Sequence, residues 1–117
     1  MSRVSQCTTP DGVLKIRVAD RFISRALGLL GGAPLDPAVG LLISPCSSIH
    51  TLGMRYSIDV VFMDREAQVL RVCANVRSGR IRFVFGARAV LELRSGVAAR
   101  HGIKPGTRLV ELTPALR

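Results

Sequence analysis

Hydrophobic and polar residues alternate along several short segments of this chain. Apolar residues recur at every second position in residues 13–18, 58–63, 81–85 and 89–94, and the positions between them include Lys15, Asp59, Arg82 and Glu92. A period of two residues is typical of a β-strand with one buried face. Three further strands are predicted from short runs rich in branched or aliphatic residues, at 39–43, 69–73 and 107–112. The pattern therefore predicts about seven short strands.

Turn sequences separate these strands, and two helical segments accompany them. Thr9-Pro10-Asp11-Gly12 predicts a β-hairpin, and residues 64–67 predict a second one. Asp20 is a suitable N-cap for a helix that runs to Leu30, and a short helical turn is predicted at 97–101. We therefore predict an α+β, mainly β fold. Its strands are largely antiparallel and form a small barrel-like sheet with one or two short helices, in a single domain over residues 1–117.

Composition narrows the class of protein without selecting a function. The chain is 48% hydrophobic but has only four Phe, one Tyr and no Trp, so its core is built from aliphatic residues. Three irregularly spaced cysteines do not describe a disulfide framework, which favours reduced thiols in a cytoplasmic protein. The first ten residues lack the apolar core of a signal peptide, and residues 37–54 contain too many Pro and polar residues for a transmembrane helix.

Basic residues exceed acidic ones strongly, and they gather in one region. The formal net charge is +9, and no acidic residue lies between Glu66 and Glu92. The candidate anion-binding residues of this region are Arg71, Arg77, Arg80, Arg82 and Arg88. A basic β surface with aromatic rings can bind single-stranded nucleic acid. Phe83 and Phe85 alternate with Arg82, however, so we expect the rings to lie in the core, and nucleic acid is possible but not the favoured partner.

Reactive side chains are densest in residues 46–59. Cys46 with His50 as a base, and Asp59 nearby, are the weak candidates for catalysis. Cys46 and His50 have a spacing that could place two ligands on a metal ion, but a structural zinc site needs four ligands, so we predict no metal and no cofactor. We expect Asp59 to form an ion pair with Arg55 or another Arg, and Asp64 to cap backbone N–H groups at its turn.

The ordered set of short motifs in this chain resembles the domain-of-unknown-function family 192 (DUF192, UPF0127-like), over about residues 22–110. The motifs that carry the resemblance are Arg25-Ala26-Leu27-Gly28-Leu29-Leu30, Ile49-His50-Thr51-Leu52-Gly53-Met54-Arg55, Ile58-Asp59-Val60-Val61-Phe62-Met63-Asp64, Ala89-Val90-Leu91-Glu92-Leu93 and Gly102-Ile103-Lys104-Pro105-Gly106. The resemblance implies a small β-rich domain whose activity has not been established. The chain departs from the family pattern at Ala67, where a turn Gly is usual.

The sequence favours a binding or interaction module with a protein or small-molecule partner. The candidate binding residues are His50, Thr51, Met54, Arg55, Asp59, Asp64 and Glu92. One alternative is an enzyme or metal protein that uses Cys46, His50 and Asp59. A second alternative is anion or nucleic-acid binding through residues 71–88. In a structure, a concave pocket with polar groups would favour an enzyme or metal protein, and a flat apolar patch would favour binding of a partner protein. A continuous basic stripe would favour binding of phosphate groups.

Overall fold

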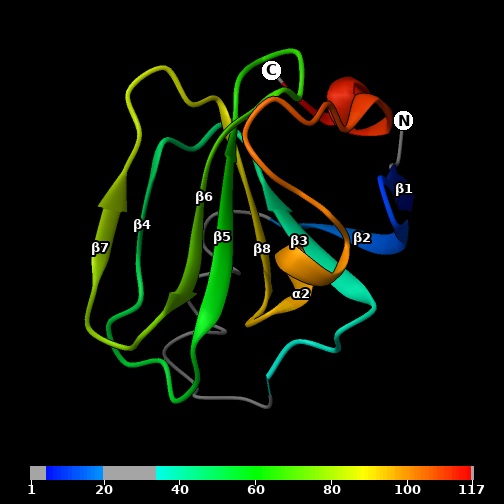
Figure 1. Cartoon of the computed structure of the whole chain (residues 1–117). Helices are drawn as coiled ribbons and strands as arrows, with labels where there is room; N and C mark the ends of the chain where they lie inside the picture. The colour runs from blue at the N-terminus through cyan, green and yellow to red at the C-terminus, as the bar shows by residue number, and fades with distance from the viewer. Residues whose placement is uncertain (1–4, 20–33, 117) are drawn as a thin grey trace.

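A computed structural model describes residues 5–19 and 34–116 of the chain, and within these ranges the fold is mainly β (Figure 1). The elements are β1 (Gln6–Thr9), β2 (Gly12–Ala19), β3 (Val39–Ile43), β4 (Ser48–His50), β5 (Ile58–Met63), β6 (Val69–Val76), β7 (Ile81–Phe83), β8 (Ala89–Arg94), the helix α2 (Val97–Arg100) and the 3-10 helix η1 (Val110–Ala115). The predicted hairpins at residues 9–12 and 64–67 are confirmed as the β1–β2 and β5–β6 connections. The predicted helix from Asp20 to Leu30 lies outside the described residues.

Six strands form one mixed sheet in the order β1-β2-β3-β8-β5-β6, and β4 and β7 form a separate two-stranded ribbon. All strand pairs are antiparallel except β2–β3. The barrel-like closure that the sequence suggested is not found in the described residues. The parallel pair of β2 and β3 needs a crossover connection instead of a hairpin. Within the described residues, β1 and β6 are the two edge strands of the sheet.

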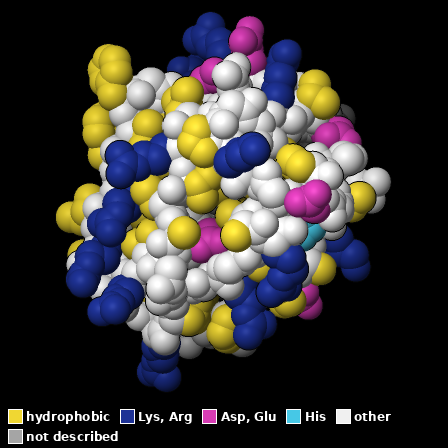
Figure 2. Space-filling model, in the orientation of Figure 1, with side chains coloured by type: hydrophobic (Ala, Val, Ile, Leu, Met, Phe, Trp, Pro, Cys, Tyr) yellow, Lys and Arg dark blue, Asp and Glu magenta, His cyan; other side chains and the backbone are white. Residues whose placement is uncertain are grey.

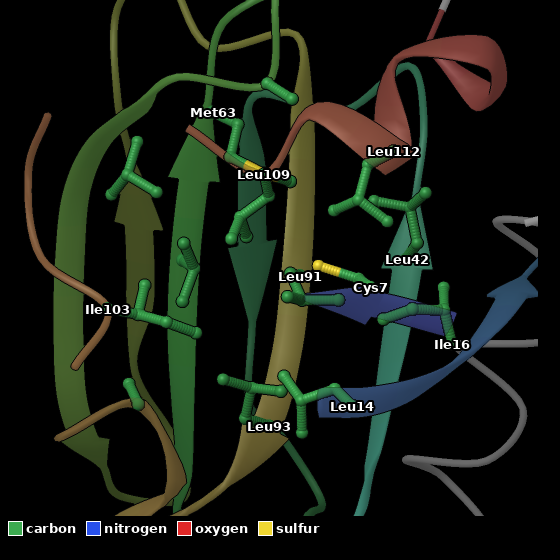
Figure 3. Packing of buried hydrophobic residues seen from close by; sticks show 14 of the residues in the cluster. Cys7, Leu14, Ile16, Leu42, Met63, Leu91, Leu93, Ile103, Leu109 and Leu112 are labelled. Atoms are coloured by element: carbon green, nitrogen blue, oxygen red, sulfur yellow. The ribbon is translucent and has the colours of Figure 1, made fainter. Parts of the chain in front are cut away.

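The central strand β5 is buried on both faces of the main sheet, because all six of its residues are inaccessible to solvent. Val61 and Met63 contribute to the larger core, where residues of β1, β2, β3 and β8 meet the C-terminal segment (Figure 3). Val60 and Phe62 point to the opposite face and form a second core with Ile49 of the ribbon. The sheet therefore carries two hydrophobic layers, and the β4–β7 ribbon covers part of the second one.

The predicted strand at residues 107–112 is wrong. The chain makes one isolated bridge there, from Arg108 to Gln68, and then forms η1. Leu109 and Leu112 are fully buried in the larger core. Their spacing of three residues matches one turn of a 3-10 helix, and this period competes with the β alternation that the sequence suggested.

The expected burial of Phe83 and Phe85 is also wrong. Ile81, Phe83 and Phe85 are 68%, 61% and 89% exposed. β7 pairs with β4, and Ile49 of β4 and Val84 after β7 are the residues that pack on the second core. Because side chains alternate between the two faces of a strand, turning Val84 inward turns the aromatic rings outward.

Candidate functional site

A cavity of about 580 Å³ lies against the second face of the main sheet, beside the β4–β7 ribbon. Leu41 and Ile43 of β3 form an apolar part of its wall, and residues 45–50 together with Leu52, Met54 and Tyr56 contribute the opposite wall and the rim. The described titratable or thiol side chains that line it are Cys46, His50, Tyr56, Arg88 and Glu92. This mixture of aliphatic walls and a few polar groups is typical of a small-molecule site.

Glu92 is the polar group with the most unusual surroundings. Its neighbours in the sheet are Leu41 on β3 and Val60 on β5, so aliphatic residues flank it on both sides. Burial raises the pKa of Glu92 from its ordinary value of 4.5 to about 7. Among the described residues, no hydrogen bond or ion pair engages its carboxyl group. The carboxyl is therefore largely desolvated, opens into the cavity, and can accept a partner.

Tyr56 is electrostatically linked to Glu92. Burial raises the pKa of the Tyr56 hydroxyl, and the negative charge of Glu92 raises it further. Both side chains line the cavity. A ligand that reaches the Glu92 carboxyl therefore also meets a neutral phenol, which can donate or accept a hydrogen bond.

Two of the three candidate catalytic residues line the cavity, but the third does not. Cys46 and His50 are both lining residues, and His50 is exposed at the rim. The Cys46 thiol donates a hydrogen bond to the carbonyl oxygen of Ser48 at 3.0 Å.

Asp59 lies on the opposite face of the sheet, where it is 1% exposed. Its carboxylate accepts hydrogen bonds from the backbone N–H groups of Asn75 at 2.8 Å, Gly96 at 3.0 Å and Ala98 at 3.0 Å. The expected ion pair with Arg55 is therefore wrong. Asp59 holds the start of α2 and the end of β6 in place, because buried N–H groups need acceptors.

The other candidate binding residues divide between the cavity and the scaffold. Met54 lines the cavity, whereas Arg55 is exposed outside it. Thr51 is fully buried, and its hydroxyl donates to the Arg77 carbonyl oxygen at 2.6 Å. Asp64 accepts backbone hydrogen bonds from residues 66 and 68 at its turn, as the sequence predicted. Thr51 and Asp64 therefore stabilise loops.

The five candidate anion-binding arginines differ in their exposure. Arg71, Arg77 and Arg80 are exposed. Arg82 is partly buried and donates from its guanidinium to the Ile81 carbonyl oxygen at 2.9 Å. Arg88 is partly buried and lines the cavity.

Sequence reasoning missed several cavity residues. The sequence predicts Leu41 and Ile43 only as strand residues and gives no prediction for Tyr56. Tyr56 is the single tyrosine of the chain, and a lone polar aromatic close to a reactive loop was the available signal. Within residues 5–19 and 34–116, no group of three His, Cys, Asp or Glu side chains could hold a metal ion. No helix in this part of the chain is long and apolar enough to cross a bilayer.

Comparisons with known proteins agree on one family. The family model DUF192, described as "Uncharacterized ACR", matches residues 5–110. The UPF0127 protein PH1112 of Pyrococcus horikoshii is 35% identical over 94 residues, which cover 78% of this chain and 80% of that protein.

Two solved structures have the same fold. A protein of unknown function from Novosphingobium aromaticivorans has a TM-score of 0.73 and 26% identity, covering 88% of this chain and 80% of that one. A Sinorhizobium meliloti protein described as a "putative transcription regulator" has the same TM-score at 21% identity, covering 88% of both chains, and this likeness concerns the fold alone.

Proposed function

We propose, from the premise that this chain belongs to the DUF192 family of uncharacterised proteins, that it binds a compact, mostly apolar molecule in the cavity beside β3 and β8. The ligand carries an amine that meets the Glu92 carboxyl. The observation that carries the proposal is this carboxyl, which is desolvated, faces the cavity and has no partner among the described residues.

The chemistry of the cavity supports this class of ligand. Leu41, Ile43 and Met54 offer aliphatic contact, which favours an apolar body. Burying an ionised carboxyl in apolar surroundings costs free energy unless the carboxyl is paired. A cation therefore gains more binding free energy at such a carboxyl than at an exposed one. The cavity volume of about 580 Å³ is within the usual range for sites of small molecules.

The test uses three probes that share one apolar body. Phenethylamine, 2-phenylethanol and 3-phenylpropionate differ in their head groups, and their binding can be followed at pH 8 by backbone amide shifts in NMR spectra. We expect phenethylamine to bind most tightly and to shift amides of β3 and β8. In Glu92→Gln its affinity should fall about tenfold or more, because the charged partner is lost. The matched control Glu66→Gln changes an exposed carboxyl outside the cavity and should leave the affinity unchanged.

The pH dependence of binding gives a second measurement. Below a pH of about 7 the amine must first displace the Glu92 proton, so its affinity should fall by up to about tenfold per pH unit. The neutral alcohol should show no such fall. Equal binding of amine and carboxylate probes, or an undiminished amine affinity in Glu92→Gln, would refute the proposal.

A further inference from the structure

The ribbon carries an exposed apolar surface that extends beyond the cavity: Ile81 and Leu52 also line the cavity, whereas Phe83 and Phe85 do not. Ile81, Phe83 and Phe85 are 68%, 61% and 89% exposed, and Leu52 nearby is 53% exposed. We call these four residues, with Arg77 and Arg80, the β7 surface. Scattered single hydrophobic residues are normal on a protein surface, but three at alternate positions along one strand and its extension form a continuous row.

Basic side chains border this row. Arg77 and Arg80 are exposed directly before β7. Figure 2 shows Lys and Arg side chains gathered on the side where Figure 1 places the β4–β7 ribbon, with exposed hydrophobic side chains beside them. No acidic residue occurs between Glu66 and Glu92, so the charge of this region is positive throughout.

We infer that the β7 surface docks on an anionic membrane surface. Phe83, Phe85 and Ile81 would enter the boundary between head groups and acyl chains, where apolar side chains leave water. The guanidinium groups of Arg77 and Arg80 would lie at the level of the lipid phosphates, which attract nearby bases. The net charge of +9 adds a long-range attraction to the same surface.

Two other occupants fit the observations less well. Single-stranded nucleic acid would use stacking on aromatic rings, but two of the four exposed apolar residues of the β7 surface, Ile81 and Leu52, offer no ring. A second copy of the chain would bring Arg77 and Arg80 close to the same bases of its partner, which costs free energy. An anionic membrane can accommodate both the apolar residues and the bases of the β7 surface. The inference does not depend on the ligand of the cavity.

The experiment measures partitioning of the full chain onto vesicles by sedimentation. The probes are vesicles of phosphatidylcholine alone and vesicles with about 30 mol% phosphatidylglycerol, at an ionic strength of about 0.1 M. We expect binding to the anionic vesicles and at least tenfold weaker binding to the neutral ones. The double variant Phe83→Ser with Phe85→Ser should lose at least tenfold in partition coefficient, and Arg77→Gln with Arg80→Gln should lose about tenfold.

The matched control changes two exposed valines elsewhere in the fold. Val13 and Val110 are 54% and 55% exposed, and the double variant Val13→Ser with Val110→Ser should keep the wild-type partition coefficient. Far-ultraviolet circular dichroism establishes that each variant is folded before it is tested.

Three results would overturn the inference. They are failure to bind anionic vesicles, equal loss in the control and the Phe variants, and binding of a single-stranded oligonucleotide that depends on Phe83 and Phe85 while vesicle binding does not. A concentration-dependent dimer that is abolished by the Phe variants, without vesicle binding, would likewise replace the membrane with a second copy.

Discussion

Removal of the Asp59 carboxylate should destabilise the protein more than removal of any exposed carboxylate. Asp59 is 1% exposed and accepts backbone hydrogen bonds from Asn75, Gly96 and Ala98. In Asp59→Ala these three N–H groups lose their acceptor, and the two that belong to the start of α2 are close to the larger core. The variant therefore tests whether this residue is part of the scaffold.

The magnitude follows from the number and the kind of hydrogen bonds. A hydrogen bond to a charged group contributes about 1.5 to 3 kcal/mol, and such contributions are less than additive when water enters the vacated space. We therefore expect Asp59→Ala to lower the free energy of unfolding by about 4 kcal/mol, and the midpoint of thermal unfolding by about 15 °C. Asp59→Asn keeps one acceptor oxygen but turns an amide N–H₂ toward a backbone donor, so its loss should be about 2 kcal/mol.

The assay is guanidinium denaturation followed by far-ultraviolet circular dichroism at pH 7. The matched control is Asp36→Ala, because Asp36 is exposed and accepts one backbone hydrogen bond, from Ala38 at 2.8 Å. Its loss should stay below about 1 kcal/mol. If Asp59→Ala loses no more than Asp36→Ala, the role of Asp59 as an acceptor for α2 is refuted.

Two further predictions concern groups whose pKa is raised by burial. Burial raises the pKa of Glu92 from 4.5 to about 7, so the folded chain holds this proton more tightly, and the free energy of unfolding should fall as the pH rises through that window and level off above it. The fall should be at most about 3 kcal/mol, and denaturation at several pH values should show it vanish in Glu92→Gln. Burial, and then the charge of Glu111, raises the pKa of the Cys7 thiol to about 12. In the folded protein at pH 8, iodoacetamide followed by peptide mass mapping should label the partly exposed Cys46 and spare Cys7, and equal labelling would contradict the closure of the larger core.

Local sequence signals were sufficient for the elements with one dominant period. The hairpin of β5 and β6 follows from two strand-forming segments on either side of a turn that begins at Asp64, whose carboxylate caps the turn as expected. The family's usual Gly at position 67 also has a physical explanation. Ala67 has a φ of 61°, a left-handed conformation that glycine adopts without steric cost.

Long-range pairing decided the features that could not be predicted. The pattern of residues 81–85 predicts a strand but not which of its two faces is buried. The pairing of β7 with β4 turns Val84 toward the second core and leaves the two Phe rings exposed. In the same way, the parallel pairing of β2 with β3 could not be inferred from either strand alone. Asp59 and Glu92 each lie between apolar residues of a predicted strand, so the sequence alone does not distinguish the surroundings of the two carboxylates.

The contrast between these two carboxylates supports the proposed ligand. Asp59 and Glu92 lie on adjacent strands, β5 and β8, but on opposite faces of one sheet. Asp59 has three backbone donors, whereas Glu92 has aliphatic neighbours and no partner among the described residues. A desolvated carboxyl without a partner lowers the stability of the folded chain, and a neutral residue at position 92 would remove that cost. Stability is commonly reduced at sites that bind or react, so a buried carboxyl with no partner among the described residues supports the proposed amine ligand.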